Sequence, residues 1–398
     1  MPEMKLAGQR YDYPISDKTL KEHLTGLQKI IKDNNLDGAI LEAHQTQFDG
    51  VIRYLTDARC HEYGTTLIVP AEGNMTMINH GVMQDPAEQC SFRNVNRLIV
   101  LPYCQCFPCT DSYEGKYIAR ELKAMHMKRV GIVYKQCFKA STVEGLLANM
   151  EDIELVDISK EFSYLKAVKN EEEIALAKKC VRVHEQLMDM VPAMIRPGRL
   201  ENDILTEIET ASRYSGCEYN GNVAVGSKAN GGGIAFFRTF AAHRRIEVGD
   251  AVTVMVEVAA PGGIYGELAR TFVLGEPDPD FAKVYEAARA GQQLVADSAR
   301  PGITGRELDK IYSDFVADNY GFKPNGRFVG HSQGYDMMES PAICPDEDME
   351  IRENMFLAIH PELIEMGHFA IACDNYLVGK ESARRVTRTP QELTIIEY

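Results

Sequence analysis

The sequence predicts a two-domain protein that combines α-helices and β-strands in both of its parts. At 398 residues the chain exceeds the usual size of a single domain. Short apolar runs alternate with helical periodicity in the first part, which is typical of a mixed α/β domain. Pairs of long amphipathic helices alternate with apolar strands in the second part. We expect domains at residues 1–164 and 165–398.

The first domain is expected to begin with an amphipathic helix at residues 17–35, where Leu20, Leu24 and Leu27 recur at helical spacing after Ser16. Further helices are expected at residues 116–125 and 141–150. Short apolar segments bounded by turn residues predict the strands of this domain, at residues 36–43, 64–70, 74–80, 98–103, 129–134 and 153–158.

The second domain is expected to open with a charged linker and a long helix at residues 171–194, capped by Asn170 and carrying acidic residues in its first turn. Later helices are predicted at residues 200–214, 280–299 and 305–319. The motifs RPGRL and RPGIT each separate a pair of helices, which suggests an internal duplication. Strands are predicted at residues 222–225, 327–334, 354–363 and 368–378.

The segment GDAVTVMVEVAAPGGIYGELARTF, at residues 249–272, reads as a β-hairpin turning at a Pro-Gly-Gly sequence. Charged residues interrupt its apolar strands at Glu257, Glu267 and Arg270. Charges in such strands either face solvent or belong to a site, because an unpaired buried charge is costly.

Composition excludes several classes of function. The net charge of −15 and the pI of about 5.2 argue against nucleic acid or an anionic membrane as the partner. We find no secretion signal and no apolar run long enough for a membrane span, so a cytoplasmic protein is expected. In that compartment the ten cysteines are expected as reduced thiols, including the cluster Cys104, Cys106 and Cys109.

Polar residues inside apolar strands of the second domain mark a candidate site. They are Glu267, His331, His360 and Cys373, the last followed by Asp374. Several buried ionisable groups in one sheet are expected to meet, because each needs a partner. A carboxylate, two imidazoles and a thiol suit zinc or another divalent ion, and the same set suits general acid–base catalysis. The alternative for each histidine is a structural role in its strand.

The order of these segments resembles the pita-bread fold of the creatinase, aminopeptidase P, prolidase and methionine aminopeptidase superfamily. The resemblance rests on AVKNEEEIALAKK, the GD…ELARTF hairpin, GHSQG and the paired closing strands, and it spans residues 165–398. The preceding domain resembles the N-terminal domain of creatinase and prolidase. The resemblance implies an α+β fold, with a C-terminal pita-bread domain preceded by a smaller α/β domain.

Metallopeptidases of this superfamily hold metal through two aspartates, one histidine and two glutamates. Their positions correspond here to Met255, Glu267, His331, His360 and Cys373, so only the histidine is unchanged. A thioether is a poor ligand for hard cations, so the resemblance does not imply a dinuclear, oxygen-rich site.

We therefore expect a metal-independent, creatinase-like hydrolase that cleaves a C–N bond of a small polar substrate, with no cofactor. His331 or His360 is expected as the general acid or base, oriented by Glu267, with His243 as a second candidate base. The creatinase histidine corresponds to Arg238, which suits a substrate carboxylate. The residues expected to bind substrate are Arg238, Glu339, Glu257, Cys373, Arg59 and His61. The last two belong to the N-terminal domain, which in related enzymes lies near the partner's pocket, so a homodimer is expected.

Two alternatives remain open at this point. One is a mononuclear metal-dependent hydrolase or lyase, with a single divalent metal on Glu267, His331, His360 and Cys373. The other is a non-catalytic binding protein of the same fold.

Overall fold

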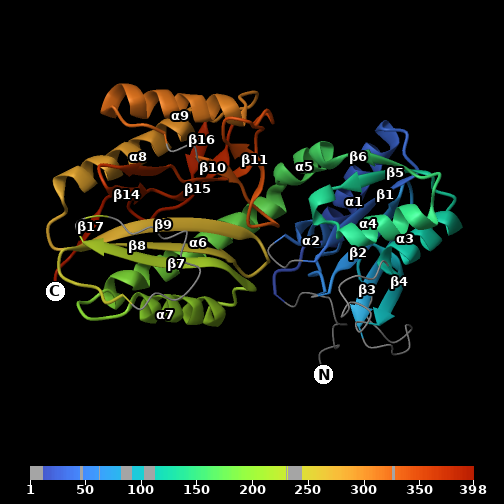
Figure 1. Ribbon diagram of the computed structural model, residues 1–398, viewed down its shortest axis with the longest axis horizontal. Helices are drawn as coiled ribbons and strands as arrows, with labels where there is room; N and C mark the ends of the chain where they lie inside the picture. Colours follow the sequence, from blue (N-terminus) through green and yellow to red (C-terminus); the bar gives the residue numbers. More distant parts are fainter. Residues whose placement is uncertain are drawn as a thin grey trace. The chain divides into compact units, whose positions relative to one another are not determined.

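The computed structural model describes residues 12–44, 48–61, 63–81, 92–102, 113–229, 231, 244–324 and 328–398. The chain divides into two compact units, Met1–Lys166 and Ala167–Tyr398 (Figure 1). None of the helices in the described part is both long and apolar enough to cross a membrane.

The N-terminal unit is built on a six-stranded sheet with the strand order β4-β3-β2-β1-β5-β6. Five of its helices are α1 (Asp17–Asp33), α2 (Gly50–Thr56), α3 (Tyr113–Ala124), α4 (Ala140–Asn149) and α5 (Ser159–Ala167). The strands are β1 (Gly38–Ala43), β2 (Thr65–Pro70), β3 (Met75–Gly81), β4 (Val95–Pro102), β5 (Arg129–Val133) and β6 (Glu154–Asp157). Helix α5 occupies part of the segment that was expected to be a linker.

A buried group of charges joins β1, α3 and the start of α4 in this unit. Lys139 forms ion pairs with Glu114 and, at 3.4 Å, with Glu42, which is fully buried. Burial raises the pKa of Glu42 from 4.5 to about 8; the charge of Glu114 adds to this rise and Lys139 opposes it. At a pH between 4.5 and about 8, Glu42 therefore keeps its proton in the folded chain but has lost it in the unfolded chain.

The stability of the protein should therefore fall as the pH rises from 5 to 8, with Glu42 contributing up to about 1.4 kcal/mol per pH unit. The substitution Glu42→Gln should remove this contribution, because the amide stays neutral at both pH values. Urea unfolding of the full chain, followed by circular dichroism at several pH values, measures the difference. The control Glu144→Gln, at an exposed position of α4, should keep the wild-type slope. Parallel profiles for wild type and Glu42→Gln would refute the prediction.

The C-terminal unit contains two main sheets, with strand orders β17-β9-β8-β7 and β11-β10-β12-β15-β16, and the small hairpin β13-β14. Its helices are α6 (Glu171–Met194), α7 (Glu201–Tyr214), α8 (Pro279–Ser298) and α9 (Gly305–Tyr320). Its longer strands are β7 (Tyr219–Ala229), β8 (Asp250–Ala259) and β9 (Tyr265–Leu274). The shorter strands are β10 (Gly330–Ser332), β11 (Glu339–Ile343), β12 (Phe356–Ile359), β13 (Glu362–Glu365), β14 (His368–Ile371), β15 (Asp374–Val378), β16 (Ala383–Arg385) and β17 (Thr394–Ile396).

Two pairs of helices cover these sheets. Helices α6 and α7 lie against β7, β8 and β9, whereas α8 and α9 lie against the strands of the second half of the unit (Figure 1). Helix α6 starts where the sequence predicts, because Asn170 and Glu173 cap each other's backbone N–H groups. Polar residues of the two sheets can therefore meet only in the layer between these helix pairs.

The β8–β9 hairpin forms as predicted, and every residue of both strands is buried. Its charged residues Glu257, Glu267 and Arg270 are at most 4% exposed. None of the three therefore faces solvent, and each must be accounted for by interactions inside the unit.

Candidate metal site

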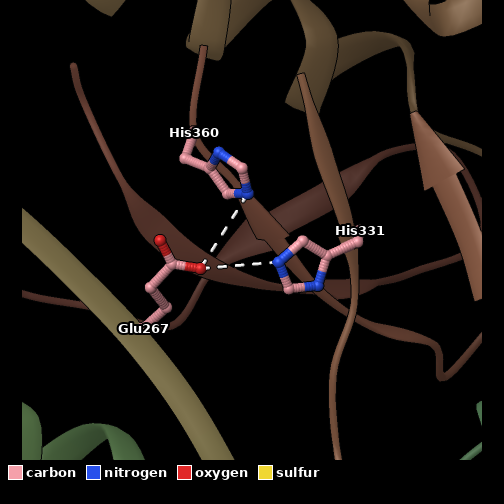
Figure 2. Close-up of side chains that lie close together, drawn as sticks. All are labelled: Glu267, His331 and His360. Carbon is pink, nitrogen blue, oxygen red and sulfur yellow. Dashed lines mark ion pairs between the residues drawn. The ribbon is translucent and has the colours of Figure 1, made fainter. Parts of the chain in front are cut away.

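Three side chains that the sequence singles out converge inside the C-terminal unit. Glu267 comes from β9, His331 from β10, and His360 follows β12 directly (Figure 2). The Oε2 atom of Glu267 lies 3.5 Å from His331 Nε2 and 3.9 Å from His360 Nε2. One ligand atom of each residue lies within 4.8 Å of the other two, and all three residues are buried.

Strand pairing explains why these residues meet. His331 lies opposite Ala358 in the antiparallel pair β10–β12, so His360 is only two residues beyond the position paired with His331. Strand β9 approaches the same sheet where Ala269 N donates to Cys373 O at 3.4 Å. The Glu267 amide N–H donates to Asn375 Oδ1 of β15 at 2.9 Å, which fixes the backbone that carries the carboxylate.

The surroundings of the two imidazoles leave ring nitrogens available to a cation. His331 Nδ1 lies 2.8 Å from the carbonyl oxygen of Ser332. Because a carbonyl oxygen only accepts, Nδ1 carries a hydrogen, and in the neutral tautomer Nε2 presents a lone pair toward Glu267. Neither ring nitrogen of His360 has a hydrogen-bond partner among the residues that the structure describes. With both imidazoles neutral, acceptor atoms face one another, which is unfavourable unless a metal cation lies between them or an imidazole gains a proton.

The directions of the pKa shifts of Glu267 and His360 also suit a cation. Burial alone would raise the pKa of Glu267, but His360, His331 and the Cys373 thiol together lower it to about 2. Burial lowers the pKa of His360; Glu267 opposes this change and His331 adds to it. An ionised carboxylate and neutral imidazoles are the forms that bind metal. Two nitrogens and one oxygen form the donor set of many catalytic zinc and non-haem iron sites. The residues present thus fit a single divalent ion.

An apolar cluster borders Glu267 where the superfamily has further carboxylate ligands. Met255 and Cys373 pack there against Ala269 and the buried side chains of Phe369 and Ile371. Burial and the charge of Glu267 raise the pKa of the Cys373 thiol well above its usual value. The thiol therefore keeps its hydrogen and bonds to Glu267. Cys373 lies outside the three-donor group, and its role as a ligand stays a prediction.

Glu257 lies directly opposite Glu267 in the β8–β9 ladder. Burial and the charge of Glu267 raise its pKa well above the usual value, which favours the neutral carboxyl group. Gln333 Nε2 donates to Glu257 Oε1 at 2.9 Å, and Gln333 Oε1 accepts from Asn375 Nδ2 at 3.0 Å. The network connects Glu257 to the residue that holds the Glu267 backbone.

Other residues expected at the site lie in different surroundings. Glu339 is buried and pairs with Lys169 at 2.7 Å. Arg59 and His61 follow α2 in the N-terminal unit, where the His61 amide donates to Thr65 Oγ1 at 2.9 Å. Arg238 and His243, like the cluster Cys104, Cys106 and Cys109, lie outside the described residues. The substrate-binding roles of all these residues stay predictions.

Sequence reasoning missed three residues near the donors. Phe328 is 39% exposed, and its ring centroid lies 5.1 Å from that of His360 and 5.8 Å from that of His331. Gln333 and Asn375 form the network described above. The sequence could have indicated Gln333 and Asn375, because both are polar residues within the GHSQG and ACDNYLV segments. Phe328 gave no comparable signal, because an aromatic residue before a strand is ordinary.

Comparisons with known proteins place this site in context. The profile of metallopeptidase family M24 matches residues 175–381. A Xaa-Pro dipeptidase of Pyrococcus horikoshii is 27% identical over 256 residues, which cover 62% of this chain and 69% of that protein.

Solved structures show the same architecture along nearly the whole chain. The dipeptidase PepE of Mycobacterium ulcerans superposes with a TM-score of 0.80 at 22% identity, covering 97% of this chain and 100% of that one. The prolidase of Pyrococcus horikoshii has a TM-score of 0.75 at 20% identity, covering 94% and 99%. These likenesses confirm the expected fold class, a pita-bread domain preceded by an α/β domain.

The expected metal-independent, creatinase-like hydrolase is wrong, and so is the expectation that no cofactor is needed. The M24 match and the similarity to Xaa-Pro dipeptidases favour a metallopeptidase. The error came from treating each replaced carboxylate as a lost ligand. The structure shows instead that His360 directs Nε2 toward Glu267 beside His331 (Figure 2).

Proposed function

Because the chain belongs to metallopeptidase family M24, we propose that it is a metal-dependent peptidase that cleaves dipeptides. Its single divalent cation is held by Glu267, His331 and His360. The similarity to Xaa-Pro dipeptidases supports proline-containing dipeptides as the first substrates to test. This proposal corresponds to the mononuclear alternative that the sequence left open, with a peptide as the substrate.

The observation that carries the proposal is the group of facing acceptors. Glu267 Oε2 and His331 Nε2 lie 3.5 Å apart, and neither has a hydrogen to share when the carboxylate is ionised and His331 is the neutral Nδ1–H tautomer. His360 adds ring nitrogens without a partner in the described part of the chain. A divalent cation would satisfy all three groups at once. Because only these three donors come together among the described residues, a further position would remain for substrate or water.

A bound zinc or iron ion supplies Lewis-acid polarisation of a peptide carbonyl and activation of water. The protein's own residues supply the surroundings. Ser332 fixes the tautomer of His331, and Asn375 holds the Glu267 backbone. Burial and the charge of Glu267 raise the pKa of Glu257, which Gln333 holds by a hydrogen bond to Oε1, so its carboxyl group is placed to give a proton to the departing amine beside Glu267.

Metal analysis combined with peptide hydrolysis tests the proposal. Purified enzyme should contain one equivalent of metal, and removal of that metal by a chelator should abolish the hydrolysis of Ala-Pro and Gly-Pro. One equivalent of Zn²⁺, Fe²⁺, Co²⁺ or Mn²⁺ should restore it. Ala-Leu and creatine serve as comparison substrates. Full turnover by metal-free enzyme, or no dipeptide hydrolysis with any of the four metals, would refute the proposal.

Phe328 should contribute to substrate affinity, because an exposed phenyl ring against both imidazoles offers an apolar contact at the site. The substitution Phe328→Ala should raise KM for Ala-Pro about tenfold, since the lost contact is worth about 1.5 kcal/mol. The value of kcat should change less than KM. Steady-state kinetics measures both.

Two further variants make this test specific. Phe328→Leu should lie between wild type and Phe328→Ala, because leucine keeps part of the apolar surface. Tyr214→Ala, which removes an aromatic side chain that is 89% exposed on α7, should leave both constants unchanged. Identical kinetics for Phe328→Ala and wild type would exclude Phe328 from substrate binding.

A further inference from the structure

A basic groove lies on the C-terminal unit, apart from the three metal donors. Its cavity of about 920 Å³ is lined by residues of α6 and of the segment from β15 through β16 to Arg388. Six cationic side chains line the groove: Lys178, Arg182, Lys380, Arg384, Arg385 and Arg388. Among the described residues, Glu353 and Glu381 are the acidic ones that line it, so this lining has an excess of four positive charges, six minus two. The chain as a whole carries −15.

Four of these cations are available to a ligand. Lys178, Lys380, Arg384 and Arg388 are exposed, and their side chains form no ion pair or hydrogen bond with any residue that the structure describes. The other two are held in place by the protein. Arg182 donates to Val386 O at 2.6 Å and pairs with Glu185, and Arg385 donates to Thr387 O at 2.8 Å.

This arrangement is unfavourable without an anion. Like charges that share a concave surface repel one another, and the groove gathers them on a protein that is otherwise acidic. Arginine binds phosphate oxygens through paired N–H donors, and lysine adds a mobile point charge. Three of the six groove cations are arginines on the short segment 384–388, which places several such donors together.

The lining also limits the kind of anion. The described lining residues include no aromatic side chain on which a nucleobase could stack. A nucleic acid strand would extend beyond the groove across the surface of a protein with a charge of −15. The cavity has the volume typical of sites for small molecules. We propose that the basic groove binds a compact, non-aromatic compound carrying two or more phosphate groups.

Calorimetric titration of the full-length holoenzyme with inorganic pyrophosphate at about 0.15 M salt tests this proposal. Wild type should bind pyrophosphate in the groove more tightly than orthophosphate or citrate. Arg384→Glu and Lys178→Glu should each weaken binding about tenfold or more, since each replaces a contact worth about 1.4 kcal/mol by repulsion. Both positions are exposed, so circular dichroism spectra should match wild type. Arg300→Glu makes the same charge change at an exposed position outside the groove and should bind as wild type does.

Pyrophosphate also binds divalent metals, so the titration is repeated with His360→Ala. Retained affinity in that variant, together with loss in the groove variants, assigns binding to the basic groove. The proposal is overturned if pyrophosphate does not bind, if both groove variants bind it like wild type, or if only His360→Ala loses binding. Citrate binding as tight as pyrophosphate, or binding of heparin alone, would likewise overturn the assignment to a small phosphate compound.

Discussion

His360→Ala should lower metal affinity by more than about 100-fold and abolish dipeptide hydrolysis. Loss of a residue that only supports a ligand costs about 10- to 100-fold in affinity or activity, and a direct ligand costs more. In the wild type, the His360 ring nitrogens have no other partner among the described residues, so alanine removes a donor whose sole evident use is the cation. The measurements are metal content after dialysis, the metal dissociation constant from competition with a chelator, and turnover of Ala-Pro.

The matched control for this prediction is His126→Asn. His126 is exposed and has a left-handed backbone with φ 58°, a conformation that asparagine tolerates. It should bind metal and cleave dipeptides as wild type does. Glu267→Gln should behave like His360→Ala, because an amide oxygen binds a divalent cation more weakly than a carboxylate. Undiminished metal affinity in both site variants would place the cation elsewhere in the chain.

Arg270→Met should destabilise the C-terminal unit by about 3–5 kcal/mol, because it removes the nearer cation from the buried Asp374 and leaves, among the described residues, only Arg385 at 3.8 Å. Arg270 NH2 donates to Asp374 Oδ1 at 2.6 Å and to Thr389 O at 2.9 Å, and NH1 donates to Cys373 O at 2.8 Å. Methionine fills much of the volume but satisfies none of these acceptors. Urea unfolding followed by circular dichroism gives the change in the free energy of unfolding.

Two comparisons distinguish the effect of breaking the buried ion pair from the effect of removing any arginine. Arg289→Met removes an exposed pair with Glu286 on α8 and should cost less than about 1 kcal/mol. The double variant Arg270→Met/Asp374→Asn should recover part of the loss, because it removes the uncompensated charge. Equal destabilisation by Arg270→Met and Arg289→Met would show that burial of the pair has no special effect.

Much of the architecture could be predicted from local patterns. The β8–β9 hairpin follows from two apolar runs around Pro261 to Gly263, and α6 follows from Asn170 and its acidic first turn. These signals act within a few residues, so a linear reading captures them. The segment of α5 was misjudged because its charges resemble those of a linker, whereas its apolar residues Phe162 and Ala167 pack in the core.

The sequence singled out the residues of the candidate site, but the main expectation from it was a site without metal. Glu267, His331 and His360 stood out as polar residues in apolar strands, which local sequence is sufficient to show. The replaced carboxylates at Met255 and Cys373 then led to the wrong inference that metal is absent. Sequence does not report whether the remaining donors meet, since they come from strands far apart along the chain.

By itself, then, the sequence determined the fold class, most of the helices and the β8–β9 hairpin, and the polar residues that the core must accommodate. Only the tertiary structure decided that His331 and His360 lie two positions apart across paired strands and that both face Glu267. The physical reason is that metal binding depends on the distance and direction of lone pairs. Those quantities follow from strand register and from hydrogen bonds such as His331 Nδ1 to Ser332 O, which no linear pattern specifies.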